Sequence, residues 1–390
     1  MATTETAGGI SFALTDEQKE LRALAREFAA KEIRPKAADY DERSHHPVDL
    51  IAKAHAVGLM NLHVPDEYGG LALSSFDGML VGEELNWGCS GIGTSIGANG
   101  LGSGPVILAG SEEQRATWLP PLIESPILCS FGLSEPGAGS DVARLQTTAV
   151  RRGDEYVLNG SKTFITNAGH AAWTVVFAKT DPAKGHRGMS AFIVPMDTPG
   201  VTIEQHLDKM GQRSTDTSAF ALNDVVVPAA NRIGAEGEGF KIAMKTLDFT
   251  RPGTAAGAVG VAQAAYEHAV AYAKERVTFD VPIAMHQGVS FLIADMATEI
   301  EAARLLTWQA AWLLDQGERA TLHSSFAKRF AADTAMKVTT DAVQVFGGYG
   351  YIKEYPVEKL MRDAKLFQIY EGTSQIQRLV IAKEIFLPRD

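Results

Sequence analysis

A serine inside a Gly-x-Ser-x-Gly motif is the first residue of this chain whose setting suggests chemistry. The motif is Gly93-Thr-Ser-Ile-Gly97, and in α/β hydrolases such a turn exposes a nucleophilic serine between a strand and a helix. Here the residues before the motif are typical of a helix end, and those after it form a glycine-rich stretch. The context favours a structural role, and a serine acyl hydrolase that uses Ser95 remains the alternative.

A second segment has the residue types of a ligand-binding loop. Ser134-Glu-Pro-Gly-Ala-Gly-Ser-Asp141 combines a proline and two glycines with two hydroxyl groups. The exposed backbone amides of such a loop can wrap around a polar ring or a phosphate. An ordinary turn has the same composition, so these residues alone leave both interpretations open.

Several common nucleotide and metal motifs are missing from the sequence. There is no Gly-x-Gly-x-x-Gly between a strand and a helix and no Gly-x4-Gly-Lys-Ser/Thr, which argues against a Rossmann nicotinamide site and a phosphate-loop ATPase. The ten histidines include no His-Glu-x-x-His, and Cys89 and Cys129 are too few for a four-cysteine zinc site. We therefore expect no metal centre.

Charge and composition restrict the partners. The 390 residues include 36 Lys and Arg against 47 Asp and Glu, and a net charge of −11 repels nucleic acid and anionic lipid. The longest small, uncharged stretch, Pro252 to Tyr266, is shorter than the roughly 20 residues of a membrane helix. The first residues lack the apolar core of a signal peptide and the arginines of a transit peptide. We expect a cytoplasmic protein with no nucleic-acid or membrane partner.

The elements that must position these residues change along the chain. In residues 1–126 the apolar spacing is helical, and Thr15-Asp-Glu-Gln18 and Ser111-Glu-Glu-Gln114 have the form of capping boxes, which start helices. In residues 127–235 short runs rich in Val, Ile, Thr and Phe predict a mostly antiparallel sheet or barrel. Residues 236–390 are helical again, and their long segments predict a four-helix bundle.

The predicted strands and long helices have definite bounds. Within the first strand segment, Asn159-Gly160 tolerates positive φ and predicts a hairpin turn. Strands are expected at 155–166, 173–179, 189–194, 201–206 and 218–227, and helices near 239–276, 286–315, 318–346 and 373–386.

Motifs spread over the whole chain resemble one family. Phe131 to Val142, with Asn159-Gly-Ser-Lys162 and Phe164-Ile-Thr-Asn167, is similar to the flavin-binding middle domain of the acyl-CoA dehydrogenases. Further similar motifs follow in the family's order and spacing: Phe249-Thr-Arg-Pro252, Glu275-Arg-Val-Thr-Phe279, His286-Gln287, Gln344-Val-Phe-Gly-Gly348, Glu354 to Ala364 and Ile369 to Gln377.

This resemblance runs from about Leu14 to Phe386 and is strongest to the straight-chain, medium-chain-like members. It implies an α+β, mostly α fold with an N-terminal helical domain, a middle antiparallel β-barrel or sandwich and a C-terminal four-helix bundle. It also implies an FAD-dependent oxidoreductase of fatty acid β-oxidation.

The implied reaction converts a saturated acyl-CoA into the trans-2-enoyl-CoA. Glu371 occupies the family's catalytic position and would take the α-proton, whereas N5 of the flavin would accept the β-hydride, which no side chain can do. Some members carry the base one position before the arginine of Thr-Arg-Pro. That position is Thr250 here, and a threonine cannot act as the base, so Glu371 has no competitor.

The resemblance also implies three groups of FAD-binding residues. Phe131, Leu133, Ser134, Gly139, Ser140, Phe164, Ile165 and Thr166 would surround the isoalloxazine, with Phe164 in place of the tryptophan of the nearest relatives. Thr373 and Gln375 lie at the start of the last helix, whose amides suit the pyrophosphate. Positions that hold the adenosine and pyrophosphate of a flavin in a neighbouring subunit are Arg276, Thr278, Phe279, His286, Gln287, Gln344, Gly347 and Gly348. A homotetramer, as a dimer of dimers, follows from this last group.

The substrate positions come from the same resemblance. Ser140, Asp248, Thr250, Arg251, Tyr370 and Gly372 would line the thioester and pantetheine end. The backbone amide of Glu371 and a flavin ribityl hydroxyl would polarise the thioester oxygen. Gly93 and Gly97 stand where medium-chain relatives close the pocket floor with long polar side chains, which predicts a deeper pocket and medium to long acyl chains.

The expected electron acceptor is electron-transferring flavoprotein, since Leu59, Leu71 and Leu73 match the family's apolar docking surface. A flavin oxidase of the same superfamily remains a further alternative, although acyl-CoA oxidases are usually much longer chains. A non-catalytic relative would keep the flavin loop and lose the base, and Glu371 argues against it.

Overall fold

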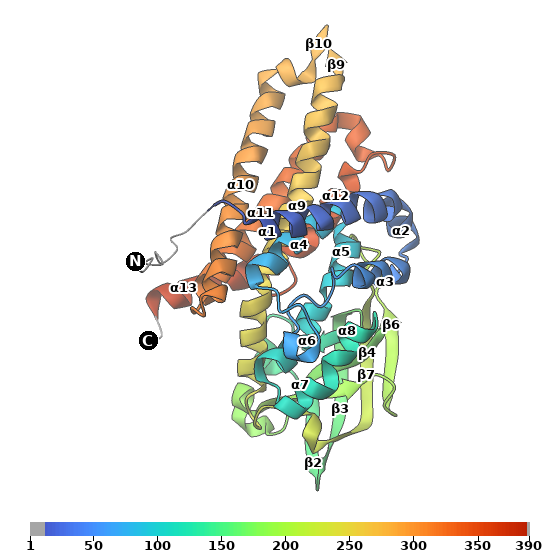
Figure 1. Cartoon of the computed structure of the whole chain (residues 1–390), viewed down its shortest axis with the longest axis vertical. Helices are drawn as coiled ribbons and strands as arrows, with labels where there is room; N and C mark the ends of the chain where they lie inside the picture. The colour runs from blue at the N-terminus through green and yellow to red at the C-terminus, as the bar shows by residue number, and fades with distance from the viewer. Residues whose placement is uncertain (1–11, 388–390) are drawn as a thin grey trace, which may run out of the picture.

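The computed structural model describes residues 12–387. The prediction of a cytoplasmic protein used the first residues of the sequence, most of which lie outside the described residues. Figure 1 shows an elongated molecule with a β-sheet at one end and a helical hairpin at the other. The first N-terminal helices, α1 to α5, lie across the middle of the long axis, whereas α6, α7 and α8 lie toward the sheet. The helix, sheet, helix order predicted from the sequence is confirmed.

Both predicted capping boxes start helices. The side chain of Thr15 accepts from the backbone of Gln18 while the side chain of Gln18 accepts from the backbone of Thr15, and Ser111 and Gln114 repeat this arrangement. These reciprocal bonds satisfy amides that the first turn of a helix leaves without partners. The N-terminal helices are α1 Asp16–Phe28, α2 Ala37–Arg43, α3 Val48–Ala56, α4 Ser75–Gly88, α5 Ser90–Gly97, α6 Asn99–Ala109, α7 Glu112–Trp118 and α8 Pro120–Glu124.

The middle of the chain forms one sheet in the order β6-β7-β3-β2-β4-β5-β8, with β1 paired to β4. Its pairs are antiparallel except β1 with β4 and β2 with β4, which are parallel. Both faces of β4 and β5 are buried, because alternate side chains point to opposite faces and a separate apolar cluster packs on each face. The strands are β1 Leu128–Gly132, β2 Thr148–Arg152, β3 Glu155–Thr166, β4 Ala171–Lys179, β5 Met189–Pro195, β6 Val201–His206, β7 Thr217–Pro228 and β8 Arg232–Ile233.

The hairpin predicted at Asn159-Gly160 is wrong, because β3 runs straight through these residues. The register against β7 shifts between Leu158 and Gly160, so the permissive residues serve a bulge instead of a turn. A Cβ on Gly160 would lie 2.5 Å from Oγ1 of Thr147, which requires glycine there. The turn itself falls between β2 and β3, at Gly153 with φ 63°.

The C-terminal part contains the four predicted long helices and one that the sequence patterns did not predict. They are α9 Gly239–Glu275, α10 Gln287–Asp315, α11 Thr321–Phe346 and α13 Ser374–Phe386, and the additional helix is α12 Val357–Phe367. A short hairpin of β9 Val277–Thr278 and β10 Val281–Pro282 joins α9 to α10. Within residues 12–387, none of the helices combines the length and apolar character that a membrane crossing requires.

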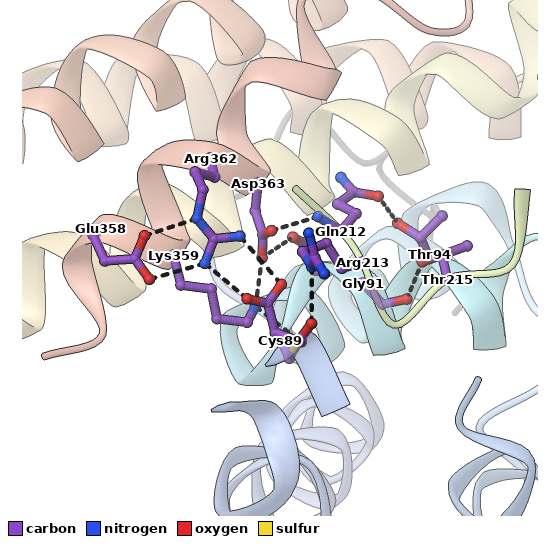
Figure 2. A network of polar contacts seen from close by, with 12 residues as sticks. Cys89, Gly91, Thr94, Gln212, Arg213, Thr215, Glu358, Lys359, Arg362 and Asp363 are labelled. Carbon is purple, nitrogen blue, oxygen red and sulfur yellow. Dashed lines mark hydrogen bonds and ion pairs between the residues drawn. The ribbon is translucent and has the colours of Figure 1, made fainter. Parts of the chain in front are cut away.

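A buried carboxylate on α12 joins all three parts of the chain. Asp363 has no exposed surface and accepts hydrogen bonds from Lys359 Nζ at 2.6 Å, Ser90 Oγ at 3.1 Å and the backbone amide of Gln212 at 2.5 Å. Ser90 starts α5, and Gln212 lies between β6 and β7. Burial alone would lower the pKa of Lys359, but the carboxylate of Asp363 raises it above its ordinary value. Figure 2 shows this network, with Arg362 beside it.

We predict that Asp363→Asn destabilises the whole chain. The amide keeps the shape of the side chain but leaves Lys359 as an unpaired buried cation, which costs about 3–5 kcal/mol. Urea denaturation followed by circular dichroism measures the change. Asp39→Asn on α2 is the control, because its pair with Arg43 is exposed and should contribute less than about 1 kcal/mol. Equal midpoints for the two variants would contradict the prediction.

Candidate active site

The loop that carries Glu371 connects α12 to α13 and has an unusual backbone. Glu371 has φ 52° and Gly372 has φ 90°, so both residues occupy the left-handed region. That conformation costs a non-glycine residue of the order of 1–3 kcal/mol, and surrounding contacts must hold it. Thr373 then caps α13, because its side chain accepts from the amide of Ile376.

Side chains from α9 hold both ends of Glu371. Thr250 Oγ1 donates to Glu371 Oε2 at 2.8 Å, and Arg251 Nε approaches the Glu371 carbonyl at 3.5 Å. Sequence reasoning excluded Thr250 as a base but did not predict that its hydroxyl would orient the carboxylate of Glu371. The available signal was the position of Thr250 directly before Arg251. Two adjacent residues of a helix can bind different groups of the same loop, here the carboxylate and the carbonyl of Glu371.

Arg251 is a buried cation with its own counter-ion. Its guanidinium is 2.6 Å from Asp248 Oδ1, and Thr321 donates to the other carboxylate oxygen of Asp248 at 2.7 Å. Burial lowers the pKa of Arg251, whereas Asp248 and Glu371 oppose that shift. Burial also raises the pKa of Asp248. The structure thus brings Asp248, Thr250 and Arg251 to the Glu371 loop, as the resemblance implies.

Tyr370 connects the same loop to the N-terminal and middle parts of the chain. Its hydroxyl interacts with Gln212 and Thr94, and Thr94 Oγ1 donates to Gln212 Oε1 at 3.0 Å. Desolvation and the neighbouring Glu371 raise the pKa of Tyr370. No sequence motif indicated Gln212, because its role depends on contacts between distant segments.

The loop at residues 134–141 is anchored from within the sheet. The backbones of Glu135 and Ala138 exchange hydrogen bonds, and the Glu135 carboxylate binds Thr147 and Lys162, whose Nζ is 2.8 Å away. Burial lowers the pKa of the fully buried Lys162 to about 8. Added Cβ atoms at Gly137 or Gly139 would meet no atom within 4 Å, so the loop backbone is accessible to a ligand.

An exposed aromatic ring lies beside this loop. Phe164 is 71% exposed with φ 59°, and the amide of its neighbour Thr163 donates to the Ser134 carbonyl at 3.0 Å. Phe131 packs on Phe177 with ring centroids 4.9 Å apart. Ile165 points the other way, and its side chain is buried in the sheet core.

The residues expected to bind a neighbouring subunit's flavin lie at the opposite end of the molecule, around the β9–β10 hairpin (Figure 1). Arg276, Thr278, Gly347 and Gly348 line a cavity of about 450 Å³. Gln287 and Gln344 are exposed nearby on α10 and α11. Phe279 and His286 also contact each other, with ring centroids 5.9 Å apart. Within one chain, the residues expected to bind a neighbouring subunit's flavin therefore lie far from the loop beside Phe164.

The other residues considered from the sequence are Ser95, the docking leucines, Ser140 and the possible metal ligands. Ser95 is fully buried inside α5 and its hydroxyl donates to the Gly91 carbonyl, a setting with no exposed nucleophile. Leu59 is only 1% exposed because it packs in the core, so of the expected docking leucines only Leu71 is largely exposed and Leu73 partly so. Ser140 is exposed on its loop, and no contact joins it to Glu371 within residues 12–387. Over the same residues no His, Cys, Asp and Glu side chains form a metal-binding group.

Family models match nearly the whole chain. The N-terminal, middle and C-terminal domains of acyl-CoA dehydrogenase match residues 15–125, 130–225 and 237–386, respectively. The chain belongs to the acyl-CoA dehydrogenase family. Its members are oxidoreductases, and the resemblance inferred from the motifs is confirmed.

Individual relatives agree with this assignment. An acyl-CoA dehydrogenase of Bacillus subtilis is 46% identical over 95% of this chain and 98% of its own length. A short-chain-specific acyl-CoA dehydrogenase of Clostridium acetobutylicum is 44% identical over 97% of this chain and all of its own. A chain in the electron transferring flavoprotein structure from Acidaminococcus fermentans is 44% identical, with a TM-score of 0.95 over 97% of this chain and 100% of that chain.

FAD is the cofactor. The structure of PigA with FAD and proline is 30% identical to this chain, with a TM-score of 0.93 over 97% of this chain and 100% of PigA. The residues present here fit the group, because the accessible loop beside the exposed Phe164 suits a ring and the cavity beside Arg276 suits a phosphate.

We predict that Glu135→Gln lowers the FAD content. The change removes the charge that pairs with buried Lys162 and so loosens the loop at residues 134–141, at a cost of about 3–5 kcal/mol. The ratio of flavin to protein absorbance after gel filtration measures the loss. Glu155→Gln is the control, since Glu155 is exposed on the same strand as Lys162. Full flavin content in the Glu135 variant would refute this role of the ion pair.

Proposed function

We propose that this enzyme oxidises a saturated acyl-CoA between Cα and Cβ to the trans-2-enoyl-CoA, with Glu371 as the base. The observation that carries the proposal is the Glu371 carboxylate, held by Thr250 on a left-handed loop beside the buried Arg251. A fixed carboxylate suits proton abstraction next to a thioester carbonyl, because orientation removes much of the entropic barrier.

The two oxygens of Glu371 have different environments. Oε2 accepts from Thr250, whereas Oε1 meets no donor among residues 12–387. Oε1 is therefore the atom that takes the α-proton from the substrate. FAD, when bound, supplies a hydride acceptor for Cβ at flavin N5.

The thioester oxygen gains negative charge as the α-proton leaves. In the described part of the chain the backbone N–H of Glu371 donates to no acceptor, although its carbonyl is held by Arg251 and Gln377. This amide is thus available to donate to the thioester oxygen, in the manner of an oxyanion hole. Because base and donor belong to the same residue, any movement of the loop affects both.

The assembly and the electron acceptor are part of the same proposal. A homotetramer would bring the Arg276 cavity of one subunit to the Phe164 loop of another, which a single chain does not do. Electron-transferring flavoprotein is the proposed acceptor, because a close structural neighbour comes from an electron transferring flavoprotein structure. The exposed Leu71 is a residue for its docking.

We predict that Glu371→Gln lowers kcat by about 10²- to 10⁴-fold, because an amide cannot take the α-proton. FAD content and binding of the enoyl-CoA product should be retained, since the amide preserves the side-chain shape. Anaerobic bleaching of the flavin by octanoyl-CoA measures the step. Ser95→Ala is the control for the hydrolase alternative and should leave turnover unchanged, because the Ser95 hydroxyl donates within its own helix. The reverse ranking of the two variants would reject the proposal.

We further propose that the enzyme accepts medium to long acyl chains. A Cβ on Gly97 would meet no atom within 4 Å, so this position leaves room at the expected pocket floor. Gly93 adds none, because its Cβ would lie 3.0 Å from the side chain of Asn86. Trp87 does not fill the space either, since its ring lies between Arg26 and Arg34, at 3.8 and 3.5 Å from the two guanidinium carbons.

We predict that Gly97→Glu shortens the preferred chain. Each buried methylene contributes about 0.8 kcal/mol, so the variant should lose hexadecanoyl-CoA turnover by at least tenfold. Butanoyl-CoA turnover should stay within about twofold and serves as the internal control. The measurement is kcat/KM with butanoyl, octanoyl and hexadecanoyl thioesters. A wild-type enzyme that turns over only butanoyl-CoA, or an unchanged profile in the variant, would contradict this proposal.

A further inference from the structure

Lys328 is a buried lysine that contacts the loop of Glu371, as Thr250 does from α9. It lies on α11, its side chain has no exposed surface, and its Nζ donates to the carbonyl of Gly372 at 2.6 Å. Burying an ammonium group is costly unless it serves a specific partner. Its hydrogen-bond partner within residues 12–387 is this one backbone carbonyl.

Gln377 on α13 is a second donor to the same loop. Its Nε2 lies 3.1 Å from the carbonyl of Glu371 and 3.1 Å from that of Gly372. Each carbonyl is therefore held by two side chains, Arg251 with Gln377 at Glu371 and Lys328 with Gln377 at Gly372. A Cβ on Gly372 would lie 2.6 Å from this same Nε2, which shows how closely the loop packs on Gln377.

These four bonds fix the peptide groups on either side of Gly372. Because α9 and α13 hold the Glu371 carbonyl and α11 and α13 hold the Gly372 carbonyl, the φ values of 52° at Glu371 and 90° at Gly372 are maintained against their intrinsic cost. The carboxylate of Glu371 then reaches Thr250 on α9. The carbonyl that Lys328 binds belongs to Gly372, the residue directly after the base.

We propose that Lys328 is a positioning residue that holds Glu371 in its reactive conformation by fixing the carbonyl of Gly372. The inference rests on the proposed role of Glu371 as the base. Lys328 does not touch the proposed reacting atoms and acts only through the backbone of the loop. Its effect should therefore fall on kcat and leave KM largely unchanged.

The charge on Lys328 changes near neutral pH. Burial lowers its pKa to about 7, with Glu371 and Asp333 opposing the shift and Arg251 adding to it. Asp333 is itself bound by Arg378 of α13 at 2.9 Å, so charged groups from the loop and from α9, α11 and α13 surround the ammonium. An arginine at this position would keep its charge over the whole range in which the lysine discharges.

The decisive experiment compares three variants of the full-length FAD enzyme. Lys328→Met removes the donor, and kcat should fall at least tenfold because a displacement of about 1 Å can cost 10²-fold. FAD content, KM and enoyl-CoA binding should change less than twofold. Lys328→Arg should recover most of kcat, and its pH profile should diverge from that of the wild type above pH 7. Lys337→Met should have no effect, because Lys337 lies on the same helix α11 but is exposed and pairs with Glu299 of α10.

The outcomes separate this inference from the proposed function. A Met variant with wild-type kcat, or one that loses FAD and kcat in parallel without rescue by arginine, overturns the role of Lys328. If the Met variant does not fold, Lys328→Gln replaces it, because glutamine is too short to reach Gly372 and should give the same loss of kcat. Residual activity in Glu371→Gln equal to wild type would instead overturn the proposed base.

Discussion

The buried carboxylate of Asp363 is the contact on which the arrangement of the active site depends. It binds α5, the β6–β7 connection and its own helix α12, so it fixes three segments that are far apart in the sequence. Glu371 lies only a few residues after the end of α12. The preceding residue, Tyr370, contacts Thr94 and Gln212, which belong to those same segments. A change in how the three parts meet would move the loop of the base with them.

Buried cations recur wherever a loop of the site must be held. Lys162 anchors the Ser134 loop through Glu135, Arg251 approaches the Glu371 carbonyl and pairs with Asp248, and Lys328 holds the Gly372 carbonyl. Pairs of this kind contribute little net stability, because desolvation offsets much of their attraction. These cations instead fix the orientation of the loops that they bind, because a buried charge has few alternative partners. The site is thus built from individually costly contacts that allow few conformations.

Local sequence patterns predicted much of the fold, and contacts between distant residues account for the rest. The capping boxes at Thr15 and Ser111 and the strand limits depend on neighbours in sequence, and the structure contains them. Asn159-Gly160 was misinterpreted because a bulge and a turn demand the same backbone freedom. Leu59 failed as a surface residue because exposure depends on tertiary packing, which sequence spacing does not reveal.

Glu371 was identified only through resemblance, which also implied Thr250 and Arg251 at the site, but the contacts of Gln377 and Lys328 with its loop were not predicted. Thr250, Gln377 and Lys328 come from three different helices, and no periodicity relates them to the loop. At Ile165 the resemblance implied a position beside the flavin but not the direction of the side chain, which strand alternation turns into the core. Resemblance to a family identifies the residues of a site, whereas the hydrogen bonds and charges around them are known only from the structure.

The unbroken length of α9 has a consequence for how this family can vary. Arg251 lies about a third of the way along it and Arg276 follows its last residue, so about 25 residues of helix set their separation at roughly 37 Å. A single inserted or deleted residue between them would rotate one end against the other by about 100° as well as shifting it by about 1.5 Å. The side chains of this helix can therefore change in type, but the number of residues between Arg251 and Arg276 cannot. Length variation should therefore be confined to the connections outside this segment.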